Sequence, residues 1–101
     1  MESIKLNREL FSGNDLANPA RLKVFITLLI WAESTPVTKE GEELKRGELV
    51  FSLSRLSRRA SVTIKQVRNA LAALAKLGKI VVRTTSLHTV VTICNYDDYI
   101  V

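Results

Sequence analysis

The sequence predicts an α+β fold of the winged helix-turn-helix class: three helices, a short strand and a C-terminal β-hairpin wing. Three segments show capping signals or apolar residues at helical spacing, and the last two are separated by a very short connection. Two runs of β-branched residues follow the third helix. A chain of 101 residues fits one domain, which we place at 18–101. Residues 1–17 are weakly patterned and are interpreted as a segment that could serve as a dimerisation arm.

The first predicted helix begins at Asn18-Pro19, where Asn is a good N-cap and Pro suits the first helical position. It runs to about Glu33, and Pro36 prevents it from continuing. This helix is apolar almost all round, whereas a surface helix shows one apolar stripe. We therefore expect it to be covered on more than one side, in part by a second subunit.

The middle of the chain alternates connections with short elements. Residues 37–46 are expected to be a polar connection, and 47–52 a short strand. Either Ser52 or Ser54 caps a helix over 53–60, and Ser61-Val62 makes a tight connection to the next helix.

Thr63 and Gln66 form a capping box that opens the third helix, which ends near Leu77 because Gly78 is a natural C-terminal cap. Its predicted inward face consists of Ile64, Val67, Leu71, Leu74 and Ala75. Its predicted outward face consists of Lys65, Gln66, Asn69, Ala72, Ala73 and Lys76. Residues 79–85 and 88–94 then form the hairpin, and 95–99 a tail.

The charge of the chain is concentrated in one half. From Leu49 to Tyr96 there are eight cations and no acid, which gives +8. Residues 1–48 carry seven cations and eight acids, and the tail adds two acids, so the net charge is +5. Positive charge localised on a helix-turn-helix and hairpin is typical of nucleic-acid binding, although charge runs are more often solvated faces with no partner.

Several classes of protein are disfavoured. One cysteine, Cys94, cannot form an internal disulfide, and one histidine, His88, cannot build a histidine metal cluster or a serine-histidine-aspartate triad. There is no secretory signal, and the longest apolar run, 24–32, is too short for a membrane span of about 20 residues. We expect a cytoplasmic protein that is not an enzyme and that uses no cofactor and no metal.

Three motifs, at 45–50 (Lys-Arg-Gly-Glu-Leu-Val), 66–71 (Gln-Val-Arg-Asn-Ala-Leu) and 92–99 (Thr-Ile-Cys-Asn-Tyr-Asp-Asp-Tyr), carry a family resemblance. The stretch 47–99 resembles the winged-helix domains of phage-type replisome organisers and DnaD-like primosome components. The resemblance implies DNA binding near a replication start and recruitment of a replicative helicase or its loader. Members of that family often have acids where this chain has Arg58 and Arg59, and glycine where it has Ser61.

In a helix-turn-helix the second helix enters the major groove and its first turns meet base edges. The residues placed there are Thr63, Lys65, Gln66 and Asn69, although Gln66 could serve the capping box alone and Asn69 could simply face water. The candidates for phosphate contacts are Arg55, Arg58, Arg59 and Lys76. Arg68 is either a further DNA contact or a residue whose stem packs on the core, and Arg83 is a wing contact.

Two functions remain open on the sequence. The first is a module that binds double-stranded DNA, dimeric through the first helix, in replication initiation; a transcriptional regulator is a variant of it. The second is an oligomerisation or protein-interaction module of a replication assembly, with little direct DNA binding. The apolar first helix suits both, whereas the stretch without acids favours the first.

Overall fold

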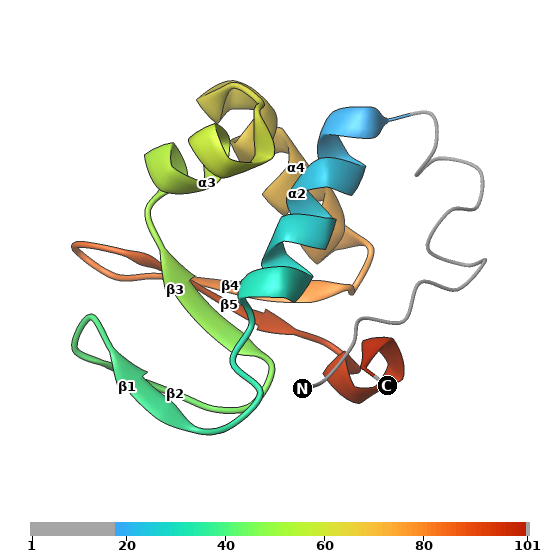
Figure 1. Ribbon diagram of the computed structural model, residues 1–101. Coiled ribbons are helices and arrows are strands. Elements are labelled where there is room, and N and C mark those ends of the chain that lie inside the picture. The colour runs from blue at the N-terminus through green and yellow to red at the C-terminus, as the bar shows by residue number, and fades with distance from the viewer. Residues whose placement is uncertain (1–17, 101) are drawn as a thin grey trace.

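The computed structural model describes residues 18–100, so the proposed arm at 1–17 lies outside the described residues. Three helices and two small antiparallel sheets make up an α+β fold, which confirms that part of the prediction. Figure 1 shows the elements, which in chain order are α2 (Pro19–Trp31), β1 (Val37–Lys39), β2 (Glu42–Leu44), β3 (Glu48–Phe51), α3 (Leu53–Ala60), α4 (Ile64–Lys76), β4 (Ile80–Thr84), β5 (Thr89–Ile93) and the 3₁₀ helix η2 (Tyr96–Tyr99).

Side-chain caps fix where the helices begin. The Asn18 side chain accepts a hydrogen bond from the Arg21 N–H, and Pro19 follows it, as predicted. Of the two serines proposed as the cap of α3, Ser52 is the cap, and its hydroxyl accepts from the Arg55 N–H at 3.2 Å. Helix α2 ends at Trp31, two residues before the predicted end, because Ala32 already has extended backbone.

Strand β5 is the centre of a three-stranded sheet with the order β3-β5-β4. Leu49 pairs with Val91 on one side of β5, and Val82 pairs with Val91 on the other. The three helices cover one face of this sheet (Figure 1). The main core lies between them, and its strand contribution comprises Leu49, Phe51, Ile80, Val91 and Ile93.

The chain itself buries the central residues of α2. Val24, Phe25, Leu28 and Leu29 are each at most 2% exposed, and α2 packs against α3 and α4. Within α2, Ile30 is the exposed large apolar side chain, at 57%. The centre of α2 is thus covered within one chain, and the dimer through this helix stays a prediction.

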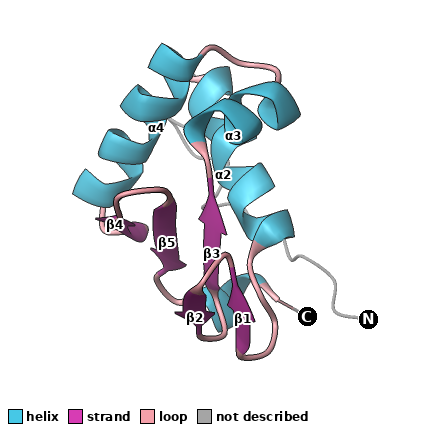
Figure 2. Cartoon of the chain, turned by 90° about the vertical axis from the view of Figure 1, so that its left-hand side faces the viewer, coloured by secondary structure: helices cyan, strands magenta, loops and turns pink. Residues whose placement is uncertain are grey.

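The predicted polar connection over 37–46 is wrong for residues 37–44, which form an antiparallel hairpin in which Val37 pairs with Leu44. Its two-residue turn, Glu40-Gly41, has φ values of 50° and 75°, the combination that type I′ turns require. The β1–β2 hairpin lies on the side of the sheet away from the helices (Figure 2).

The centre of that second face of the sheet is also buried. Side chains alternate between the two faces of a strand, so Val90 points away from the core that Val91 joins. Val90 is 1% exposed and Leu44 of the hairpin is 2% exposed, yet neither belongs to the main core. The sheet is therefore an inner layer, with helices on one face and the β1–β2 hairpin on the other.

Gly47 lies against three other parts of the fold: the segment after α2, strand β5 and helix η2. Its N–H donates to the Glu33 carbonyl at 2.8 Å, and its carbonyl accepts from the Ile93 N–H at 2.8 Å. Its φ is +84°, and a Cβ at this position would stand 2.9 Å from Cβ of Tyr96 in η2. Only glycine combines this backbone conformation with this close approach.

Replacing Gly47 with Ala should lower the free energy of unfolding by about 2 to 4 kcal/mol, because it adds backbone strain and forces Tyr96 to move. The matched control is Gly41→Ala. Gly41 has a similar φ of +75° but no atom within 4 Å of the added Cβ, so the loss should be about 1 kcal/mol. Urea unfolding of the two variants measures both values, and equal losses would contradict the role given to Tyr96.

Candidate nucleic-acid interface

Helices α3 and α4 are joined by a turn that several contacts define. Ser61 has a φ of 56°, the left-handed conformation for which glycine is best suited, so this serine adopts a geometry typical of glycine. The Ser57 hydroxyl donates to the Val62 carbonyl, and the Val62 N–H donates to the Ser57 carbonyl. The turn therefore holds α4 at a fixed angle to α3.

The predicted capping box at the start of α4 is confirmed. The Thr63 hydroxyl accepts from the Gln66 N–H at 3.0 Å, and Oε1 of Gln66 accepts from the Thr63 N–H at 2.9 Å. Both side chains are exposed, but each already uses an acceptor oxygen to begin the helix. The structure therefore assigns both residues a structural role, whatever else they contact.

Helix α4 buries a stripe that differs from the prediction at its ends. Val67, Leu71 and Leu74 are buried as expected. Ile64 and Ala75 were predicted to face inward but are exposed, Ile64 at 40%. Ala70, which the prediction omitted, is buried in their place because its small side chain lets α4 lie close against α2.

The face opposite this stripe is polar and basic. At 100° per residue, the positions farthest from the buried stripe are Lys65, Asn69, Ala72 and Lys76, with Arg68 beside them. All are exposed, so Arg68 belongs to the surface and not to the core margin. Ala72 keeps the middle of this face narrow.

Five cations on α3 and α4 form no ion pair with any residue that the structure describes. We call them the α3–α4 cations: Arg58, Arg59, Lys65, Arg68 and Lys76. Neither helix contains an acid that could neutralise them. All five are exposed, so this side of the molecule has a positive charge that is available to an external anion.

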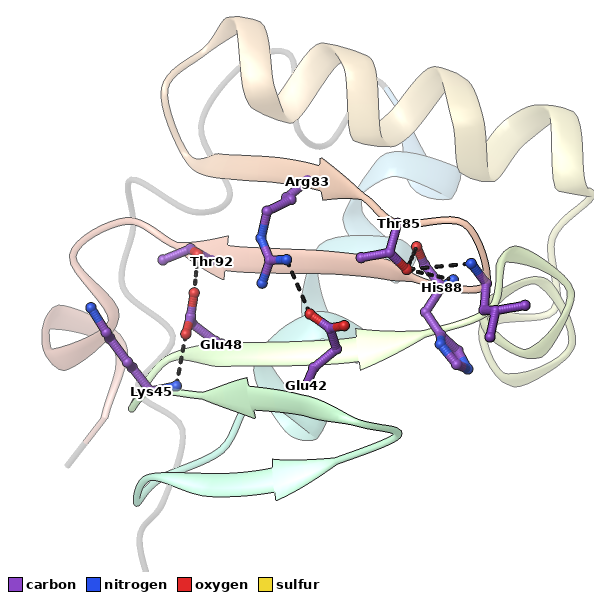
Figure 3. Close-up of polar contacts among 8 residues, drawn as sticks. Glu42, Lys45, Glu48, Arg83, Thr85, His88 and Thr92 are labelled. Carbon is purple, nitrogen blue, oxygen red and sulfur yellow. Dashed lines mark hydrogen bonds and ion pairs between the residues drawn. The ribbon is translucent and has the colours of Figure 1, made fainter.

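The structure places two other predicted contacts elsewhere. The Arg55 guanidinium lies 5.1 Å from the centre of the Trp31 ring, as a cation–π pair. Arg83 reaches from β4 across the sheet, and its Nη1 lies 3.0 Å from Oε1 of Glu42 in β2 (Figure 3). Neither Arg55 nor Arg83 is therefore one of the α3–α4 cations. The sequence held no signal for these two pairings, because the partners come from distant elements.

Acidic side chains gather on the opposite side of the sheet. The β1–β2 hairpin carries Glu40, Glu42 and Glu43, and Glu48 stands at the start of β3. Oε2 of Glu40 lies 3.6 Å from Nε2 of His88 in the β4–β5 turn. The hairpin is therefore bound to the sheet by polar contacts, of which Figure 3 shows that between Glu42 and Arg83, as well as by Leu44.

Glu48 is the carboxylate whose titration the surroundings change most clearly. Its burial acts to raise its pKa, but hydrogen bonds from the Lys45 N–H (2.7 Å) and the Thr92 hydroxyl (2.8 Å) lower it. The nearby charges of Lys45 and Arg83 lower it further, so the net result is a pKa below the ordinary value. Figure 3 shows this carboxylate between β3, β5 and the end of the hairpin.

Residues 18–100 contain neither a metal-binding cluster nor a membrane-spanning helix. No group of three or more histidine, cysteine, aspartate or glutamate side chains in this part of the chain could hold a metal ion. No helix there has both the length and the apolar character to cross a membrane.

Comparison with known proteins gives no neighbour for this arrangement. The chain matches no protein-family model, no curated protein and no solved structure.

Glu48→Gln should cost stability in a pH-dependent way. A depressed pKa in the folded state stabilises the protein above the unfolded-state value of about 4.3, and this contribution is lost as the pH falls through the lower folded-state pKa. The difference in the free energy of unfolding between the wild type and Glu48→Gln should therefore be largest near pH 7 and should decrease as the pH falls toward 3. Urea unfolding at pH 7, 5 and 3 measures it, with Glu43→Gln, an exposed carboxylate of β2, as the control. A difference that stays constant with pH would contradict the assignment.

Gln66→Ala should lower the free energy of unfolding by about 1 kcal/mol, because it removes one half of the capping box. Asn69→Ala, on the exposed face of the same helix, should cause no loss, since Ala is the better helix former. Thermal denaturation compares the two variants. A loss that is equal for both would mean that the Gln66 side chain does not stabilise the start of α4.

Proposed function

We propose that this chain is a module that binds double-stranded DNA, of the winged helix-turn-helix class, with α4 in the major groove. The observation that carries the proposal is the set of five unpaired α3–α4 cations on two helices joined by a fixed turn. The order of α2, β3, α3, α4 and the β4–β5 hairpin is the order of that class. The chain's acids lie elsewhere, including the β1–β2 hairpin across the sheet.

In this proposal the outward face of α4 meets the bases. Lys65 and Asn69 are exposed polar side chains in its first two turns, on the side opposite the buried stripe, and no capping interaction uses them. Asparagine can pair with adenine through two hydrogen bonds, and lysine can donate to the acceptors of guanine. Thr63 and Gln66 would stand at the entrance of the groove, with their acceptor oxygens directed to the backbone of α4.

Phosphate contacts would come from the remaining cations. Arg58 and Arg59 lie in the last turn of α3, and Lys76 lies in the last turn of α4. These three cations are therefore near the two ends of the helix that enters the groove. Arg68 lies beside the outward face of α4 and would contact one strand. Arg55 and Arg83 contribute less in this proposal than the sequence predicted, because Trp31 and Glu42 already hold them.

The biological role that we propose is replication initiation or primosome assembly of the phage type, in which such a module positions a helicase or its loader. The motifs at 45–50, 66–71 and 92–99 support this role through their family resemblance alone. A role in transcriptional regulation would use the same DNA-binding surface.

Fluorescence anisotropy with duplex and single-stranded DNA at two salt concentrations tests the proposal. Four neutralised phosphates, at Arg58, Arg59, Arg68 and Lys76, give an expected slope of about −3.6 in log K against log salt for duplex DNA. Arg58→Ala/Arg59→Ala should make the slope shallower by about 1.8. The control is Lys39→Ala/Lys45→Ala, which removes the same charge from the β1–β2 hairpin and the residue after it and should leave the slope unchanged.

The same assay tests the orientation of α4. Lys65→Ala/Asn69→Ala should abolish preference among duplex sequences and leave binding at low salt. Preference that survives this change would contradict the placement of α4. Absence of duplex binding at low salt would overturn the proposal itself and favour a protein-interaction module.

A further inference from the structure

The outer edge of β4 is free of any strand in the part of the chain that the structure describes. Cys94 N–H donates to the Lys79 carbonyl, and Thr85 N–H donates to the His88 carbonyl, so residues 79 and 85 direct their backbone groups to the β5 side. In an antiparallel pair this direction alternates along the strand. Ile80, Val82 and Thr84 therefore direct their N–H and carbonyl groups outward from the sheet.

This edge lacks the features that usually prevent pairing between proteins. Natural edge strands are protected by proline, lysine, bulges or charges that point inward. Strand β4 reads Ile-Val-Val-Arg-Thr, and it pairs with β5 in an unbroken register with no bulge. Its single charge, on Arg83, is paired with Glu42. Val81 and Val82 are 57% and 36% exposed.

We propose that this edge binds the same edge of a second copy of the chain, in an antiparallel pair centred on Val82. In this register Val82 faces Val82 of the other copy, and Ile80 faces Thr84. Each of the three outward residues has one donor and one acceptor, so the two strands together have twelve groups and form six hydrogen bonds. The symmetric register thus pairs every outward group of both strands, and one pair of valines meets at the two-fold axis.

The symmetry places both helical layers on one side. The two-fold axis that relates neighbouring antiparallel strands runs perpendicular to their sheet, so α2, α3 and α4 of both copies lie over the same face of a six-stranded sheet. The β1–β2 hairpins lie together on the other face. This interface differs from a dimer through α2, and its formation does not require that the chain bind DNA.

Sedimentation velocity of the full chain over a range of concentrations tests the proposal. The wild type should show a concentration-dependent shift from one chain to two. Val82→Lys sets two like charges directly opposite each other and should weaken the association at least tenfold. Leu87→Lys is the matched control, because Leu87 is 81% exposed in the β4–β5 turn, outside the proposed register, and should associate like the wild type.

A charge-swap mixture separates loss of pairing from loss of folding. Val82→Lys and Val82→Glu should each remain monomeric, whereas their equimolar mixture should form the dimer, because opposite charges then face each other. Three results would overturn the proposal: a wild type that stays monomeric at all concentrations, a Val82→Lys chain that associates like the wild type, or a mixture that does not associate.

Discussion

The central position of β5 is the constraint on which the other elements depend. This strand is paired along both edges, to β3 and to β4, and it is buried on both faces. Val91 and Ile93 face the helices, while Val90 faces the side of the β1–β2 hairpin. The strand therefore fixes the position of three layers at once. The C-terminal η2 helix follows directly from it, and Tyr96 of that helix packs where a side chain of residue 47 would stand.

The sequence predicted the parts of the fold that local chemistry determines. The caps Asn18, Ser52 and Thr63 lie next to the helices they begin, and β-branched runs are strong local signals for strands. The sequence did not predict the β1–β2 hairpin, because its strands have three residues each and carry mostly polar side chains. Its stability comes from tertiary contacts, such as burial of Leu44 and pairing of Glu42 with Arg83, which no local pattern contains.

In the candidate site, too, the sequence predicted some features, and others depend on residues that are distant in the chain. The basic character of α3 and α4 was visible in the sequence, since no acid lies between Leu49 and Tyr96. Which cations remain available depends on side chains far away in the chain. Arg55 lies over Trp31, 24 positions earlier, and Arg83 pairs with Glu42, 41 positions earlier. A count of charge along the sequence therefore overstates the available charge of the β4–β5 hairpin, at Arg83, and of α3, at Arg55.

The separation of the α3–α4 cations from the acidic β1–β2 hairpin makes the molecule an electric dipole across the sheet. In the field of a polyanion such a molecule experiences a torque as well as an attraction, so it turns its basic side forward before any contact is made. A larger share of collisions then begins in a productive orientation, and the benefit appears in the rate of encounter rather than in the lifetime of the complex. Because small ions screen the field beyond a distance of about 8 Å at physiological ionic strength, this turning is confined to the last step of approach.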